Sequence, residues 1–182
     1  MTAPRPMLRT PRLLLRPFSP ADGDALHAYL GDPEVVRYEP YEPYSRGASR
    51  AEAARRADDP DFWAVVLDGP EATLVGNLWL HPTSSEAHTW QLGYVFGRQW
   101  WRQGLATEAC RAGLEHVVAG GAHRVEARCD PRNTASWRLL ERLGLRREAH
   151  LHQAASFRRD GNGDPVWHDT YIYAVLAEEW RG

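Results

Sequence analysis

Residues 98–107 carry the small and cationic side chains that an anion-binding loop needs. The segment reads Arg98-Gln99-Trp100-Trp101-Arg102-Gln103-Gly104-Leu105-Ala106-Thr107. It lies between a predicted strand and a predicted helix, so its main-chain N–H groups can point at an anion, and the helix dipole adds about half a positive charge there. Gly104 and Ala106 leave room for phosphate oxygens, and Arg98 or Arg102 can add charge-assisted bonds. The loop is suited to a pyrophosphate, although a plain strand-to-helix turn shares its spacing and is common in α/β proteins.

Three further stretches, in chain order with this loop, resemble one enzyme family. They read Thr10-Pro11-Arg12-Leu13-Leu14-Leu15-Arg16, Asn133-Thr134-Ala135-Ser136 leading to Glu141-Arg142-Leu143-Gly144-Leu145, and Trp167-His168-Asp169-Thr170-Tyr171 leading to Glu179-Trp180. With the loop they resemble the GCN5-related N-acetyltransferase (GNAT) superfamily over nearly the whole chain. Gly104 and Ala106 match that family's acyl-CoA loop, whereas Trp101 departs from its usual Gln or Arg. An aromatic residue there is typical of the branch that acetylates ribosomal-protein N-termini, the RimJ/RimL-like enzymes.

The resemblance implies a fold, a reaction and an acyl donor. The fold would be α/β (α+β), a GNAT fold with a mixed, mostly antiparallel sheet of about seven strands and about four helices, splayed between the fourth and fifth strands. The reaction would be acetyl transfer from acetyl-CoA to a primary amine, by direct attack in a ternary complex. The resemblance implies that the pyrophosphate is held by the main-chain amides of Arg102, Gln103, Gly104, Leu105, Ala106 and Thr107. It also implies that Asn133 contacts the pantetheine arm or the adenosine side, whereas Asn after Pro131 is equally an ordinary helix N-cap.

Acyl transfer to an amine needs a neutral amine, donors for the acyl oxygen and a proton for the departing thiolate. The resemblance implies a main-chain amide near Val95 or Phe96 as the donor for the oxygen, because the family's fourth strand bulges there and splays from the fifth. Many family members carry a tyrosine at the position of Leu140, which cannot donate a proton. The role then passes to water or to Ser136, whose hydroxyl can face the thioester sulfur; an ordinary surface serine is the alternative.

The general base is the least defined part of the predicted site. The family's strand motif Glu-Ile-Gly-Tyr is Gln91-Leu92-Gly93-Tyr94 here, and Gln91 can orient a water but cannot take its proton. Glu86 and His88 on the preceding turn, and His81 at the end of the preceding strand, are candidate bases, since histidine titrates near neutral pH. Each of the three is also an ordinary solvated turn residue.

The segment Tyr38-Glu39-Pro40-Tyr41-Glu42-Pro43-Tyr44 is stiff, aromatic and acidic. Such a loop can hold a cationic amine, so we expect it to bind the acceptor through Tyr38, Glu39 and Tyr41. We expect Trp79 and Gln91 beside them. The alternatives are a surface loop whose tyrosines pack on the first helix, and a tryptophan that belongs to the core.

The elements that must position these residues follow from the hydrophobic pattern. Strands are predicted over residues 8–18, 62–67, 73–80, 88–96, 123–129, 145–156 and 166–176. Helices are predicted over residues 19–31, 49–57, 104–119 and 133–143, with capping boxes opened by Ser19 and Ser49. In the third helix the small or apolar side chains fall on one face, which predicts close packing on a sheet. These are Ala106, Ala109, Cys110, Gly113, Leu114 and Val117.

Length and charge limit the remaining possibilities. A chain of 182 residues fits one domain, so we expect a single domain over residues 1–182. The net charge of −2 argues against nucleic acid as a partner. No apolar run approaches the about 20 residues of a membrane span, so we expect a cytoplasmic protein that does not use a membrane, as a monomer or homodimer.

Cysteine and histidine usage argues against a metal or a disulfide scaffold. Cys110 and Cys129 are too few for either, and we expect both to be reduced packing residues. The remaining histidines, among them His150, His152 and His168, lack the spacing of a metal site, so we expect no metal. The alternative functions are an acyl-CoA-binding module without catalysis, a succinyl-CoA-using relative, and a domain that binds another phosphate compound.

Overall fold

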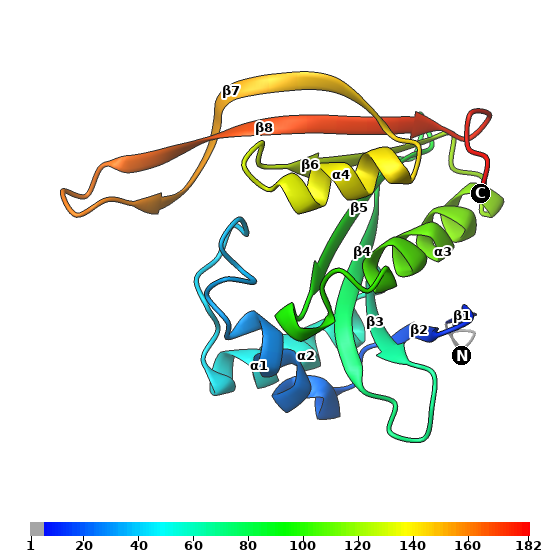
Figure 1. Ribbon diagram of the computed structural model, residues 1–182, viewed down its shortest axis with the longest axis horizontal. Helices are drawn as coiled ribbons and strands as arrows, with labels where there is room; N and C mark the ends of the chain where they lie inside the picture. The colour runs from blue at the N-terminus through cyan, green and yellow to red at the C-terminus, as the bar shows by residue number, and fades with distance from the viewer. Residues whose placement is uncertain (1–5) are drawn as a thin grey trace.

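The computed structural model describes residues 6–182, and one eight-stranded sheet forms its centre (Figure 1). Residues 1–5 of the predicted domain lie outside the described residues. The strands are β1 Leu8–Arg9, β2 Leu13–Pro17, β3 Phe62–Leu67, β4 Leu74–Ser84, β5 Thr89–Phe96, β6 Arg124–Cys129, β7 Arg146–Arg159 and β8 Pro165–Leu176. Their order is β1-β2-β3-β4-β5-β6-β8-β7, and every neighbouring pair is antiparallel except β5 with β6. The predicted mixed, mostly antiparallel sheet is confirmed, with one strand more than expected.

Helices cover both faces of the sheet. They are η1 Pro20–Asp22, α1 Gly23–Leu30, α2 Arg46–Asp58, η2 Arg98–Trp100, α3 Leu105–Ala119 and α4 Thr134–Arg142. The core has two parts: α3 and α4 pack on one face, and α1 and α2 pack on the other. None of the described helices is long and apolar enough to cross a membrane.

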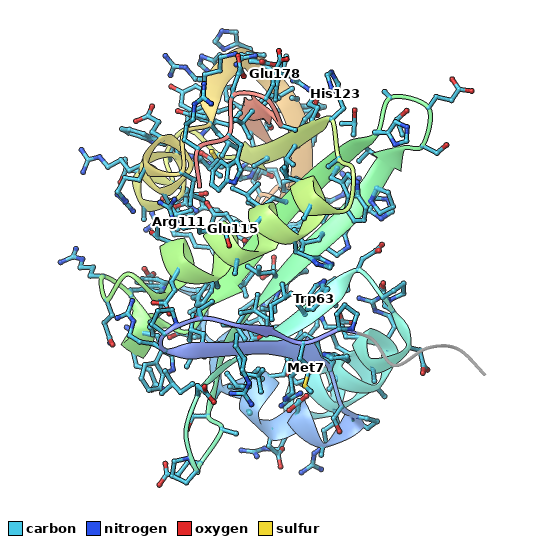
Figure 2. The ribbon with its side chains drawn as sticks, turned by 90° about the vertical axis from the view of Figure 1, so that its right-hand side faces the viewer. Met7, Trp63, Arg111, Glu115, His123 and Glu178 are labelled. Atoms are coloured by element: carbon cyan, nitrogen blue, oxygen red, sulfur yellow. The ribbon has the colours of Figure 1, made fainter. Side chains whose placement is uncertain are left out.

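The small-residue face of α3 packs against the middle of the sheet, as predicted. Ala109, Cys110 and Leu114 have no exposed surface. A Cβ added to Gly113 would lie 3.0 Å from the Leu78 side chain, so the glycine lets the helix approach the strand closely without displacing Leu78. Beside this contact the ring of Trp63, labelled in Figure 2, lies 5.2 Å from that of His116 on α3. The position of α3 is thus fixed by shape, which in turn fixes the loop before it.

Two predicted boundaries were wrong for local reasons. The predicted strand 8–18 is a hairpin of β1 and β2, because the Thr10 N–H turns back to bond the Leu13 carbonyl at 2.9 Å. The second helix begins at Arg46 and not at Ser49, since Ser45 caps it by accepting a bond from the Ala48 N–H. Ser49 is buried inside that helix.

The predicted splay lies between β5 and β6. The two strands pair only over residues 89–92 of β5, whereas β5 continues to pair with β4 through Phe96. Beyond the last pair, Leu92 with Ala127, β6 pairs with β8 alone in the described chain. The two neighbouring strands therefore diverge from Gly93 onward, between the loop before α3 and the beginning of α4. This region of diverging strands is called the splay.

Candidate active site

The loop before α3 presents a run of unpaired main-chain donors. Arg102 and Gly104 have positive φ angles of 61° and 79°, so the chain turns sharply before the helix begins. In the described chain the N–H groups of residues 102–107 have no hydrogen-bond partner, and regular helical bonding begins with Glu108 N–H to the Gly104 carbonyl at 3.0 Å. Successive free N–H groups in such a turn, at a helix N-terminus, form an anion site. The residues present thus fit a pyrophosphate.

Arg12 holds this loop in place and was missed by the sequence analysis as a positioning residue. Its guanidinium donates to the Gln103 carbonyl at 2.9 Å and to the Glu108 carboxylate at 2.7 Å. Of the two arginines proposed as extra anion ligands, Arg98 is paired with Asp32 at 3.0 Å. Arg102 is exposed and has no partner among the described residues, so it is the cation that remains available to an anion here.

The beginning of α4 brings two hydroxyl groups together at the other side of the splay. Asn133 caps the helix, since its side-chain oxygen accepts from the Ser136 N–H at 3.2 Å. Ser136 Oγ lies 2.8 Å from the hydroxyl of Tyr94 on β5. Burial raises the pKa of the Tyr94 phenol well above its usual value, so this group keeps its proton. Leu140, one turn further along α4, is fully buried core.

The strand geometry of β5 indicates which N–H groups face the splay. The Gly97 N–H bonds the Val75 carbonyl of β4 at 3.0 Å. Val95 and Gly93 lie two and four residues before Gly97, so their N–H groups point the same way, toward β4. Because main-chain groups alternate along a strand, the N–H groups of Tyr94 and Phe96 point the other way, toward β6. The predicted bulge is absent here, since the β4–β5 register is unbroken from Gly76 to Pro82. Phe96 thus directs its N–H into the splay, and Val95 does not.

The loop between α1 and α2, residues 32–44, contacts the segment before α4 and the strand β7. Figure 1 shows it rising from α1 toward the long hairpin of β7 and β8. The Tyr38 hydroxyl donates to the Arg132 carbonyl just before α4, at 3.4 Å. Arg158 of β7 donates to the Val36 carbonyl at 3.2 Å and lies 3.0 Å from the Glu42 carboxylate. Three segments distant in sequence therefore meet here.

Glu39 is the acidic residue of this loop whose proton affinity has changed most. Glu39 is partly buried, and desolvation raises the pKa of its carboxyl to about 7, despite a hydrogen bond from Tyr41 that favours the ionised form. Its charge also raises the pKa of Tyr94, which places Glu39 within electrostatic range of the splay. A carboxyl that titrates near neutral pH can take a proton from an amine under physiological conditions.

The structure does not bring Glu86 and His88 to this site. The His88 carbonyl accepts from the His123 N–H at 2.8 Å, and His123 follows the C-terminal end of α3. The anion loop lies at the opposite, N-terminal end of that 15-residue helix, about 22 Å away at 1.5 Å per residue. His81 is engaged with Asp61 at 2.6 Å.

Trp79 and Gln91 lie on neighbouring strands of the sheet. Trp79 packs over Gly93, where a Cβ would lie 3.4 Å from its ring, and stacks on His81 at 4.9 Å. It therefore lies at the beginning of the splay. Gln91 stands opposite His81 in the β4–β5 register and two residues before Gly93.

Comparison with known proteins gives the family of this chain. The family model of the acetyltransferase (GNAT) domain matches residues 12–146. The uncharacterized N-acetyltransferase YnaD of Bacillus subtilis is 32% identical over 176 residues, which cover 96% of this chain and 99% of that one. An acetyltransferase of the GNAT family from Bacillus anthracis has a solved structure with a TM-score of 0.86 and 33% identity, covering 96% of this chain and all of the other.

A relative with a stated acceptor is more distant. The ribosomal protein uS5-alanine N-acetyltransferase of Escherichia coli is 26% identical over 121 residues, which cover 65% of this chain and 59% of that enzyme. The branch suggested by Trp101 is thus present among the relatives at low identity. The matched family model, the relatives at full length and the splayed sheet agree, and the chain belongs to the GNAT acetyltransferase family and is an N-acetyltransferase.

Proposed function

We propose that this protein transfers an acetyl group from acetyl-CoA directly to a primary amine, with both substrates bound at once. The family takes its acyl group from acyl-CoA. The observation that carries the proposal is the run of unpaired N–H groups at residues 102–107, next to the exposed Arg102. Acetyl-CoA, when bound, supplies an activated thioester. We further propose that residues 1–182 act as one domain in the cytoplasm, as a monomer or homodimer.

Glu39 receives the proton of the acceptor amine in this proposal. An α-amine has a pKa of about 7.7–8.0 and must lose its proton to attack. With a pKa of about 7, Glu39 is largely ionised at pH 7.5 and can form an ion pair with the ammonium group before accepting that proton. Tyr38 lies next to it in the loop, and its ring already lies 5.9 Å from the Arg132 guanidinium, so this ring can face a cation; Tyr41 instead packs on the core beside α1. Glu39 therefore replaces Glu86 and His88 as the proposed base.

The other side of the splay handles the charge and the second proton. The N–H groups of Phe96 and Tyr94 point into the splay and can stabilise negative charge on the acyl oxygen. The Ser136 hydroxyl can donate a proton to the leaving sulfur while the Tyr94 hydroxyl, which burial keeps protonated, passes its own proton to Ser136; solvent water then returns a proton to Tyr94. This pair takes the role of proton donor, which the leucine side chain at position 140 cannot perform. Asn133 contributes by capping α4 and so fixing Ser136.

The acceptor is proposed to be a protein N-terminal α-amine. The relative that acetylates uS5 alanine supports this class, and the acidic loop of residues 38–44 supports a cationic acceptor. A small-molecule amine and a succinyl donor are the alternatives that the same loop allows. A binding module without catalysis is favoured only by Leu140 and Gln91. The hydroxyl pair of Ser136 and Tyr94 supplies the proton donor that Leu140 cannot provide.

The experiment is an acyl-transfer screen followed by mass spectrometry. Acetyl-CoA and succinyl-CoA are each offered with a peptide beginning in alanine, the same peptide with a blocked N-terminus, and spermidine. We expect the peptide with the free N-terminus to gain an acetyl group and the blocked peptide to remain unchanged. Transfer to spermidine alone would contradict the proposed acceptor, and succinyl transfer would contradict the donor. Binding of acetyl-CoA without turnover on any amine would show that the protein is an acyl-CoA-binding module without catalysis.

A further inference from the structure

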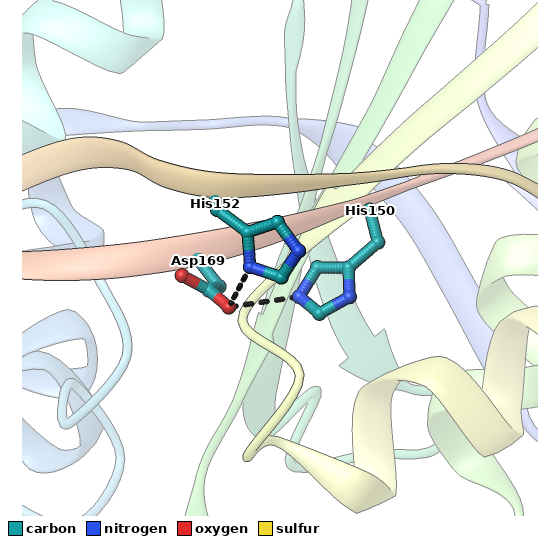
Figure 3. Close-up of side chains that lie close together, drawn as sticks. All are labelled: His150, His152 and Asp169. Atoms are coloured by element: carbon teal, nitrogen blue, oxygen red, sulfur yellow. Dashed lines mark hydrogen bonds and ion pairs between the residues drawn. The ribbon is translucent and has the colours of Figure 1, made fainter.

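Two histidines and an aspartate meet on the long hairpin formed by β7 and β8. His150 and His152 stand two residues apart on β7, and Asp169 lies on the paired strand β8 (Figure 3). The Oδ2 atom of Asp169 lies 2.8 Å from His150 Nε2 and 3.1 Å from His152 Nδ1. The three candidate ligand atoms all lie within 4.8 Å of one another. The site in Figure 3 thus offers two imidazole nitrogens and one carboxylate oxygen to a single point.

The surrounding backbone orients this cluster. At Gln153 the β7–β8 register shifts and φ is 48°, which turns the Gln153 N–H toward Asp169 Oδ1 at 2.9 Å. That bond fixes the carboxylate and leaves Oδ2 facing the imidazoles. The His150 ring also packs edge-on against Tyr171 at 4.8 Å. Partners of this kind, which orient a ligand through its second atom or its ring, are characteristic of protein metal sites.

We propose that His150, His152 and Asp169 bind one Zn²⁺ ion. Imidazole nitrogen with a single carboxylate suits Zn²⁺, whereas Mg²⁺ and Ca²⁺ prefer sites made only of oxygen. Ligands about 2.0–2.2 Å from a tetrahedral Zn²⁺ are about 3.4 Å apart, so small rotations of the exposed histidines bring all three into place. Water completes the coordination, because His152 is 76% exposed on its side chain. Histidine spacing along the chain predicted no metal because the third ligand comes from the paired strand.

The position of the site gives it a structural consequence. Beyond Tyr171, which is paired with Cys129, β8 has no partner in β6, so residues 151–170 form a two-stranded arm. The zinc ligands lie at the base of this arm and join its two strands where their register shifts. The far part of the arm carries Arg158, which contacts the loop of residues 32–44. Bound zinc would therefore stiffen the arm.

The test is calorimetric titration of ZnCl₂ into the full chain without a histidine tag, with MgCl₂ as the comparison. We expect one Zn²⁺ per chain, no response to Mg²⁺, and affinity at least about tenfold weaker in His150→Ala and in His152→Ala. His123→Ala is the matched control, since His123 is exposed at the start of β6 (Figure 2) and should leave zinc affinity unchanged.

Circular dichroism without zinc verifies that each variant is folded, and His152→Gln serves if the alanine variant is not. Equal zinc affinity in the double variant His150→Ala/His152→Ala, or no zinc bound by the wild-type chain, would overturn the proposal. Among the described residues, none of the three ligands contacts a side chain assigned to acyl transfer. A failed zinc titration would thus leave the acyl-transfer screen to decide the proposed function by itself.

Discussion

At the scale of single residues, the raised pKa of Glu39 suits this carboxyl to accept the proton of the acceptor amine. A carboxyl with a pKa of about 7 should give kcat/KM a rise with pH centred near 7, because only the ionised form accepts a proton. Glu39→Gln should remove that rise and lower kcat/KM by about 10²-fold or more at pH 7.5. A pH–rate profile for each protein makes the measurement. The titration of the acceptor's own amine, at about pH 8, remains in both profiles.

Glu42→Gln is the matched control for this prediction. Glu42 lies in the same loop, is 73% exposed on its side chain and pairs with Arg158. Its variant should keep the rise near pH 7. A Glu39→Gln enzyme with an unchanged pH profile would show that another group or a water path removes the proton.

The hydroxyl pair at the beginning of α4 gives a second prediction at this scale. Because Ser136 Oγ and the Tyr94 hydroxyl lie 2.8 Å apart, they should act as one unit. Ser136→Ala and Tyr94→Phe should each lower kcat by about 10²-fold while the Kd of acetyl-CoA stays within about twofold. The double variant should lose no more than the worse single variant, because groups that act together are not additive. Unchanged kcat in Ser136→Ala would return the proton to water.

Residue types alone suggest only part of the proposed site. The Tyr-Glu-Pro pattern draws attention to Tyr38 and Glu39, because an acidic aromatic loop is unusual, and their role stays a prediction. Tyr94 could not be assigned, since its partner Ser136 lies 42 residues away and meets it only once α4 is packed on β5. Glu86 and His88 are not at the proposed site, because they precede β5 and the splay lies at the far, C-terminal end of that strand.

At the scale of elements, the beginning of α3 is the feature that the function requires. Gly104→Glu should abolish acetyl-CoA binding in calorimetry, because its carboxylate would occupy the anion site and repel phosphate. The left-handed φ of 79° adds a strain of about 1–2 kcal/mol for any other residue. Gly121→Glu is the matched control. It imposes the same kind of strain at φ 94°, in open space past the other end of α3, and should bind acetyl-CoA normally.

The arm of residues 151–170 supports a prediction about the acceptor. Arg158 joins the arm to the loop of residues 32–44 through the Val36 and Arg37 carbonyls and Glu42. Arg158→Ala should raise the KM of the acceptor about fivefold, equivalent to about 1 kcal/mol, while leaving acetyl-CoA affinity unchanged. Arg159→Ala, which removes only a bond to the Gly163 carbonyl within the arm's own turn, should change neither. Equal KM in the two variants would show that the arm does not order the loop.

Element positions were more predictable than their ends. The four helices and the strands from residue 62 onward were found from periodicity, because amphipathic patterns report directly on packing. The sequence predicts one strand where β1 and β2 form a hairpin, because the alternation of apolar and polar residues over 8–18 continues through the turn at Pro11. Ser45 and Ser49 both suit a helix cap, and only the tertiary burial of Ser49 decides between them.

At the scale of the whole molecule, acid should weaken the junction between sheet and α4. Asp130 follows β6 and is bonded by Arg132 and by His168 of β8, which lowers the pKa of its carboxyl from 3.8 to about 2 against the effect of burial. A lowered pKa stabilises the fold above about pH 4, and that contribution is lost as the pH falls toward 2. Chemical denaturation of Asp130→Asn should therefore show a smaller loss of unfolding free energy between pH 4 and pH 2 than the wild type. Equal losses would remove Asp130 from the junction.

The general architecture of the molecule could be predicted, and the assembly of its site only in part. Family resemblance and periodicity together gave the mixed sheet, its splay and the loop before α3. The arm's reach to residues 32–44 and the third ligand of the zinc cluster depend on strand register. A one-residue shift of register turns every side chain of a strand to the other face, and the sequence alone does not determine it for exposed strands.

The free N–H groups of residues 102–107 are proposed to bind the pyrophosphate of acetyl-CoA. This binding is tested by an amide NMR titration of the 182-residue chain with acetyl-CoA, and with ATP as the comparison. We expect the largest chemical-shift changes with acetyl-CoA to fall on residues 102–107 and near Ser136, and Gly104→Glu to abolish them. Shifts confined to other surfaces, or a stronger response to ATP, would contradict it.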